Sequence, residues 1–168
     1  MGERDMGVTR RAFMGGATAA VLASRGRLSP AHAAGRPALP IPPELRPDAD
    51  GRIALAAREG TKVFRPGLTT PTYGYNGDYL GPALRLRRGG KVAVSVDNLL
   101  EEPITTHWHG LIVPGEQDGG PHQIIKPGAQ WHVDLSIEQP AATLWYHPHY
   151  YPTTASLVLK GLAGLLII

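Results

Sequence analysis

The stretch ALRLRRGGKVAVSVDNLL, residues 83–100, decides the fold class of this chain. In its second half Val92, Val94 and Val96 alternate with small or polar residues. This two-residue period is typical of a strand that buries one face and exposes the other. The adjacent glycines at 89–90 separate it from a preceding apolar run and favour a tight turn. We therefore expect two short strands joined by a turn.

Strand patterns of the same kind recur on both sides of this stretch. The chain also has 21 glycines and 16 prolines, which favour many turns over long helices. Only TTASLVLKG, residues 153–161, indicates a helical turn. Seven or eight short strands between residues 52 and 168 predict an all-β fold, a β-sandwich or small Greek-key barrel. The further strand candidates are residues 52–64, 104–113, 130–137, 142–149 and 161–168.

The first 33 residues have the features of an export signal. Arg10 and Arg11 precede a mildly apolar stretch, and the small residues of Ala-His-Ala at 31–33 suit a signal-peptide cleavage site. The paired arginines favour the twin-arginine route. We therefore predict a twin-arginine signal peptide over 1–33 and an exported protein, periplasmic or secreted.

The rest of the chain divides by composition. Residues 34–51 are rich in proline and predict an extended arm without a core of its own. Residues 52–168 carry all the strand patterns and form the predicted domain. No apolar run reaches the roughly 18 residues of a membrane span, so none is expected.

The charge balance argues against a polyanionic partner for the predicted domain. Of 17 basic and 14 acidic residues, five and two lie in the predicted signal, which leaves 12 of each. A formally neutral chain gives no indication of nucleic acid or an anionic surface as a partner. The basic cluster LRLRRGGK, residues 84–91, is interpreted as a solvated strand end and its turn. The absence of cysteine excludes disulfides and thiolate metal ligands.

Four of the seven histidines lie in two His-x-His pairs, HWH at 107–109 and HPH at 147–149. Residues i and i+2 of a strand point to the same face, so each pair presents two imidazoles to one side. Two pairs on neighbouring strands would present four, and four charged imidazoles would repel one another. Bound metal is the natural reason to gather them, and imidazole suits copper, zinc, iron and nickel. The spacing alone therefore predicts a metal site and leaves the metal open.

The residues around the pairs resemble the first cupredoxin domain of the multicopper oxidases, the group of laccases and bacterial periplasmic cuprous oxidases. Both His-x-His pairs, PGEQDGGP, QPAAT and GLAGLLII occur in the family's order, and the similarity covers roughly residues 53–168. The resemblance implies a cupredoxin-like Greek-key β-sandwich. It also implies a trinuclear cluster of one type 2 and two type 3 coppers, at which O2 is reduced to water.

The resemblance also assigns roles by position. It implies that His107 is a ligand of type 2 copper and that the type 3 ligands are His109, His147 and His149. Asp118, in GEQDGG, matches an acidic residue that is thought to deliver protons in the family. An aspartate before two glycines is equally typical of a plain turn, so both interpretations stay open.

The other aromatic residues and histidines near the pairs are given ordinary roles. Trp108, Trp145 and Tyr146 are interpreted as core residues. His122 and His132 are interpreted as loop or strand histidines outside the site.

The chain lacks part of the family's pattern. A complete member binds type 1 copper through one cysteine and two histidines near its C-terminus, where the other four cluster ligands also lie. This chain has no cysteine and stops where the first domain ends. We therefore expect half of a trinuclear site, no type 1 copper, and activity only with a C-terminal cupredoxin domain, O2 and a phenolic or metal-ion reductant.

The alternative function is a non-enzymatic periplasmic copper-binding module or carrier. The sequence leaves open the reducing substrate, and whether the chain is a short protein or part of a longer reading frame.

Overall fold

The valine alternation forms the centre of one sheet in the computed structural model, which describes residues 38–168. Strand β5 (Lys91–Asn98) buries Val92, Val94 and Val96, each less than 5% exposed. It pairs in parallel with β2 (Arg52–Arg65) and antiparallel with β7 (Gln130–Ser136). Strand β3 (Leu68–Tyr75) completes a four-stranded sheet in the order β3-β2-β5-β7. The two strands expected on either side of the turn at 89–90 are confirmed as β4 (Ala83–Arg85) and β5, but they belong to different sheets and do not pair.

The second sheet has five short strands in the order β1-β4-β9-β8-β6. Parallel and antiparallel pairs are mixed, since β4 runs parallel to both β1 and β9 while β8 runs antiparallel to β9 and β6. Most consecutive strands of the chain lie in different sheets; only the pairs β2–β3 and β8–β9 stay within one sheet among the described residues. The bounds are β1 (Glu44–Leu45), β4 (Ala83–Arg85), β6 (His107–His109), β8 (Thr143–His147) and β9 (Gly164–Ile167).

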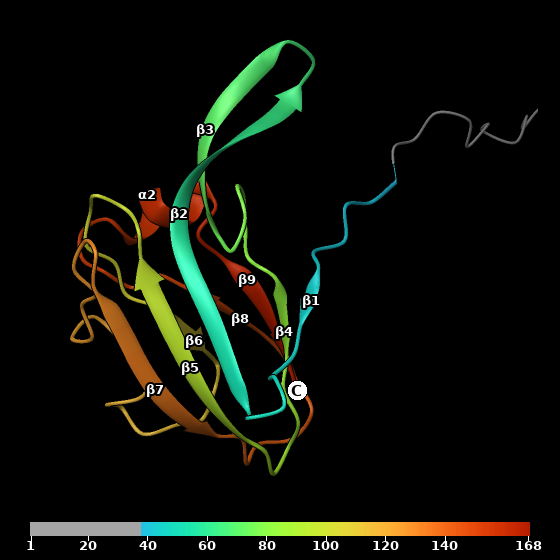
Figure 1. Ribbon diagram of the computed structural model, residues 1–168, viewed down its shortest axis with the longest axis vertical. Helices are drawn as coiled ribbons and strands as arrows, with labels where there is room; N and C mark the ends of the chain where they lie inside the picture. The colour runs from blue at the N-terminus through green and yellow to red at the C-terminus, as the bar shows by residue number, and fades with distance from the viewer. Residues whose placement is uncertain (1–37) are drawn as a thin grey trace, which may run out of the picture. The chain divides into compact units, whose positions relative to one another are not determined.

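The two sheets pack face to face around one apolar core. Figure 1 shows β2, β5 and β7 in front of the sheet that contains β8 and β9. Inward residues of both sheets belong to a single buried cluster, which includes Leu55, Val94, Leu135, Tyr146 and Leu166. Burial of this apolar surface is the main favourable term in folding. The predicted all-β sandwich is confirmed.

The predicted helical turn is also confirmed, as α2 (Thr154–Lys160), which ends at Gly161 in the left-handed conformation. All strands and α2 lie in the unit Ile41–Ile168. Among the described residues no helix is long and apolar enough to cross a membrane. The predicted signal peptide, residues 1–33, lies outside the described residues.

The proline-rich stretch before β2 contributes to the second sheet. Within it β1 pairs with β4, and Leu45 packs against the core. The Glu44 carboxylate accepts a hydrogen bond from Arg85 Nε at 2.6 Å, and this exposed side-chain contact also links β1 to β4. The composition of residues 34–51 predicted an extended arm; the structure adds that part of this arm is a sheet edge.

Strands β2 and β3 continue beyond the sandwich as a two-stranded hairpin (Figure 1). The half of β2 that pairs with β5 alternates buried and exposed residues, whereas the half after Ala57 is mostly exposed. Val63, Phe64 and Leu68 near the hairpin tip are each more than half exposed.

Tyr146 links β8 to the segment just before β4 and supports a first prediction. Its hydroxyl donates to the Pro82 carbonyl oxygen at 2.8 Å, and its ring lies against Gly81 and Gly164, where an added Cβ would overlap it. Tyr146→Phe leaves that buried carbonyl without a partner, so the free energy of unfolding should fall by about 1–2 kcal/mol. Urea denaturation of the two proteins measures this; an unchanged midpoint would show that the bond contributes nothing.

Candidate metal centre

The two His-x-His pairs come from adjacent antiparallel strands. In the register of β6 and β8, His107 lies opposite His147, and His109 lies opposite Trp145. Between them Trp108 lies opposite Tyr146, and both are 0% exposed in the core. The strand alternation therefore turns the histidines away from the core, to the outer face of the five-stranded sheet, as the spacing predicted.

Three of the four predicted ligands form one compact group. Ring nitrogens of His107, His109 and His147 all lie within 4.8 Å of one another. Nδ1 of His109 and Nε2 of His147 face each other at 3.1 Å. His149 is nearby but outside this group, with its ring centroid 5.3 Å from that of His107 and 6.2 Å from that of His147.

His107 is oriented by the loop that contains Asp118. Its Nδ1 lies 2.9 Å from the Asp118 main-chain oxygen and 3.2 Å from Oδ2 of the same residue. A carbonyl only accepts, so Nδ1 carries the proton and Nε2 keeps its lone pair. The main-chain N–H of Trp108 donates to the same carbonyl oxygen at 3.2 Å. Such a partner on the remote ring nitrogen is what fixes the tautomer of a metal-binding histidine.

Gly119 makes this contact possible, because it lets the loop approach β6 closely. Its φ is +69°, and a Cβ added there would overlap the carbonyl oxygen of Thr106. Only glycine accepts both conditions at low cost.

His147 is held in the neutral form that binds metals. The side chain is buried, and this burial lowers its pKa to about 4, against an opposing hydrogen bond from Nδ1 to the Pro148 carbonyl oxygen. Positive charge on the neighbouring histidines would lower the pKa further. At pH 7 the ring is therefore neutral. Its Nδ1–H donates to the Pro148 carbonyl oxygen, and the Nε2 lone pair faces the other histidines of the group.

Three residues at the site were not identified from the sequence as parts of it. Trp145, expected in the core, lies on the outer face and stacks on His147 with ring centroids 3.9 Å apart. Thr105 Oγ1 accepts the main-chain N–H of His149 at 2.6 Å. Gln139 accepts from Ile112 N–H and donates to the Gly110 carbonyl, and so fixes the turn after His109.

Only Trp145 had a signal in the sequence. It stands two residues before His147, so strand alternation places both on one face. The partners of Thr105 and Gln139 are 44 and 27 residues away, which no local pattern encodes. The other interpretations hold: Trp108 and Tyr146 are core residues, and His122 and His132 are exposed outside the group.

The donor set fits a first-row transition metal. A metal–imidazole bond measures roughly 2.0–2.1 Å, as for zinc, so one ion could contact both His109 Nδ1 and His147 Nε2 across their 3.1 Å separation. An all-imidazole set suits copper and zinc better than magnesium or calcium, which prefer oxygen ligands.

A two-sheet β-sandwich with imidazoles from two paired strands defines a cupredoxin-like metal-binding domain. A family model described as multicopper oxidase matches residues 57–168. The chain belongs to the multicopper oxidase family, and its expected cupredoxin-like fold is confirmed.

Similar proteins include oxidases and a protein named for its part in cell division. The multicopper oxidase mco of Staphylococcus aureus is 45% identical over 138 residues, which cover 80% of this chain and 31% of that protein. The cell division protein FtsP of Escherichia coli strain K12 is 35% identical over 97% of this chain and 35% of its own length. The chain thus spans about a third of the length of these relatives.

Among solved structures, the laccase-like multicopper oxidase CueO of Ochrobactrum sp. superimposes with a TM-score of 0.75. The two are 44% identical, and the match covers 77% of this chain and 29% of that one.

Proposed function

We propose that this chain is the N-terminal copper-binding domain of a multicopper oxidase and contributes half of a trinuclear copper cluster. The complete protein would reduce O2 to water while it oxidises a phenolic or metal-ion substrate. One observation carries the proposal: His107, His109 and His147 converge on paired strands, and main-chain carbonyl oxygens hold the Nδ1 protons of His107 and His147, so that Nε2 is the atom through which each would bind an ion.

The four histidines divide between two kinds of copper in this proposal. His107 binds type 2 copper, and the type 3 coppers are bound by His109, His147 and His149. The facing pair of His109 and His147 nitrogens supports a shared ion for these two residues. His149 lies beside His107 with its main chain fixed by Thr105, which leaves its exposed ring free to serve a neighbouring ion. Bound copper would supply the one-electron chemistry that protein side chains lack.

Asp118 is the proposed proton relay. O2 reduction consumes four protons, and a carboxylate between solvent and the site can take up and release them in turn. The Asp118 side chain is 32% exposed, and its Oδ2 lies 3.2 Å from His107 Nδ1. It thus contacts both water and a proposed ligand. The alternative turn role rests on its main chain, which ends the 115–118 turn.

Asp118→Asn separates these two roles. The main-chain oxygen that orients His107 is unchanged, so copper affinity should stay within about threefold of the original. Loss of the titrating carboxylate should slow O2 reduction by about 10²-fold or more, within the usual contribution of a proton-transfer group. Copper titration and O2 uptake measure the two effects; equal O2 uptake by both proteins would assign Asp118 to the turn alone.

The proposed cluster needs a partner domain. Imidazoles from β6 and β8 form the group, and His109 within it is exposed, so another domain could approach the proposed ions there. A C-terminal cupredoxin domain, in the same or another chain, would supply the remaining ligands and the type 1 copper at which electrons enter. Export through the signal predicted over 1–33 would place the assembly in the periplasm or outside the cell.

O2 uptake tests this proposal. The copper-loaded chain should show no steady O2 consumption with a phenolic or cuprous substrate, and addition of a matching C-terminal cupredoxin domain should restore it. Sustained turnover by the chain alone would refute the need for a second half. No turnover with any partner domain, despite stoichiometric copper, would favour the alternative below.

A copper-binding module without enzymatic activity is the second candidate. Three grouped imidazoles can hold an ion with no redox partner. The similarity to FtsP as well as to oxidases means that family membership alone does not decide between the two.

A further inference from the structure

A second site lies at the end of the sandwich where β4 leads into β5. There the structure has a cavity of about 640 Å³, within the size range of small-ligand and peptide pockets. Its floor includes the apolar side chains of Leu86, Val92 and Ile137, which are otherwise buried. Ala141, just before β8, also lines it, whereas His147 ends that strand. The cavity and the histidine group therefore lie at opposite ends of β8.

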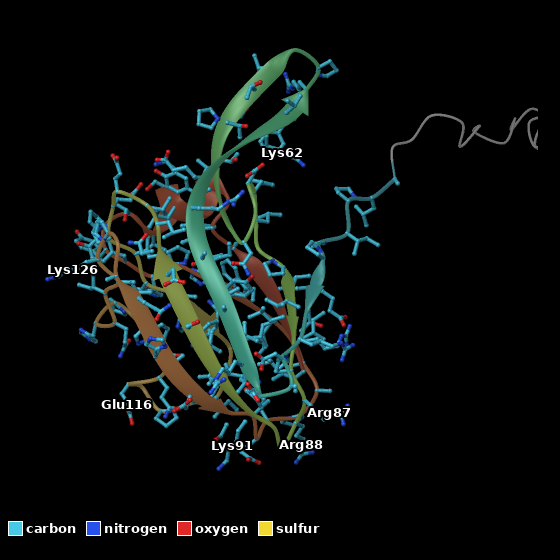
Figure 2. All side chains as sticks on the ribbon, in the orientation of Figure 1. Lys62, Arg87, Arg88, Lys91, Glu116 and Lys126 are labelled. Carbon is cyan, nitrogen blue, oxygen red and sulfur yellow. The ribbon has the colours of Figure 1, made fainter. Side chains whose placement is uncertain are left out.

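The rim of this cavity is strongly cationic. Five basic side chains line it, contributed by the segment after β1, by β4, by the following turn and by β5: Arg46, Arg85, Arg87, Arg88 and Lys91. Figure 2 shows Arg87, Arg88 and Lys91 gathered at one end of the sandwich, away from Lys62 on the hairpin. The chain outside the predicted signal has 12 basic and 12 acidic residues, so this end holds a concentrated excess of positive charge.

Little of that charge is neutralised within the chain. Arg46 and Arg85 share one carboxylate, that of Glu44. Arg87, Arg88 and Lys91 have no ion pair with any residue in the described part of the chain, 38–168. Like charges so close together repel one another, and a bound anion would relieve this.

Glu44 shows which anion the rim accepts. Its two oxygens bridge two guanidinium groups, Oε1 to Arg46 Nε and Oε2 to Arg85 Nε, both at 2.6 Å. The hydrogen bond from Arg85 and the charge of both arginines lower the pKa of this carboxyl. Charge-assisted pairs of this kind are the strong form of carboxylate recognition.

We propose that this cavity binds an acidic polypeptide segment, with carboxylates on Arg87, Arg88 and Lys91 and an apolar side chain on the floor. These three cations, unpaired within the described residues, lie along residues 87–91, so a ligand with several carboxylates can neutralise more of them than an ion with a single charge. The apolar floor between them adds a contact that inorganic anions cannot make.

Binding of a defined peptide to the full chain tests this site. The probe is a fluorescein-labelled peptide with Asp-Glu-Leu-Asp-Glu at its centre, followed by fluorescence anisotropy. We expect saturable binding that weakens with salt, and at least a tenfold weaker affinity for the Arg87→Glu, Arg88→Glu double variant. Lys62→Glu makes the same change of charge per site on the hairpin and should bind like the original. Lys62, Arg87 and Arg88 are all exposed, and thermal denaturation verifies that the variants fold.

Three further ligands separate the peptide from other anions. A peptide with Asn-Gln-Leu-Asn-Gln at the same peptide concentration should fail to displace the acidic peptide, and so should inorganic phosphate and vesicles of phosphatidylglycerol at the same concentration of negative charge; displacement by the neutral peptide would show that the carboxylates are not recognised. Displacement by phosphate would reduce the site to a general anion site, and tight binding of the vesicles would make it a membrane contact. Either result, or equal binding by the double variant, would overturn the proposal. None of these measurements involves copper, so their outcome is independent of whether the proposed oxidase function is correct.

Discussion

His147→Ala is expected to abolish O2 reduction by the assembled oxidase while the colour of its type 1 copper remains. His147 is the most buried of the four proposed ligands, and its Nε2 faces His109 Nδ1 at 3.1 Å. It is one of the three described histidines whose ring nitrogens lie within 4.8 Å of one another. Mutation of groups that merely orient a ligand costs about 10–100-fold in affinity or activity, so loss of a ligand should cost at least about 100-fold.

The measurement is O2 uptake together with the visible spectrum of the same sample. His147→Gln serves as a second variant, because it keeps a polar side chain under Trp145 and limits the cavity that alanine would leave. His132→Ala on β7 is the matched control, since this histidine is exposed and belongs to the other sheet. If the His147 variants reduced O2 at the original rate, the ligand assignment would be wrong.

Gly119→Ala should be the most damaging single methyl addition near the site. The left-handed φ of +69° costs a non-glycine residue about 1–2 kcal/mol, and the new Cβ would overlap the Thr106 carbonyl oxygen. The loop must then move away from β6 and lose the bond from Trp108 N–H to Asp118, worth about 1 kcal/mol. The free energy of unfolding should therefore fall by about 2–4 kcal/mol.

Urea denaturation of the metal-free protein measures this loss. Gly115→Ala, in the same loop, is the control, because a Cβ there meets nothing within 4 Å and its φ is not left-handed. The control should change stability by less than about 0.5 kcal/mol. Copper affinity should also fall in Gly119→Ala, since the loop no longer orients His107. Equal stability of the two variants would contradict the close packing of this loop on β6.

Much of the fold could be predicted because its signals are local. The alternation of Val92, Val94 and Val96 follows from the two-residue period of a strand, and the structure confirms it. The order of strands in the two sheets could not be derived this way, since β2 pairs in parallel with β5 through contacts about 40 residues apart. Strand β1 was missed because two residues between prolines carry no periodicity.

The same distinction holds for the site. The i, i+2 spacing placed each histidine pair on one face, and their register across β6 and β8 brought the pairs together. The sequence alone could not predict that the ring nitrogens of His149 lie outside the compact group of the other three, because β8 ends at His147 and the strand alternation does not extend to His149. Trp145 was assigned to the core together with Tyr146, although the alternation that buries Tyr146 turns Trp145 outward.

Copper titration of the isolated chain tests the central claim most directly. With a competing chelator to set the free ion concentration, the original protein should bind copper tightly. His107→Ala, His109→Ala and His147→Ala should each lower the affinity at least tenfold, while His132→Ala should leave it unchanged. Copper affinity that is the same in all four variants would contradict the claim that these paired strands form a copper site.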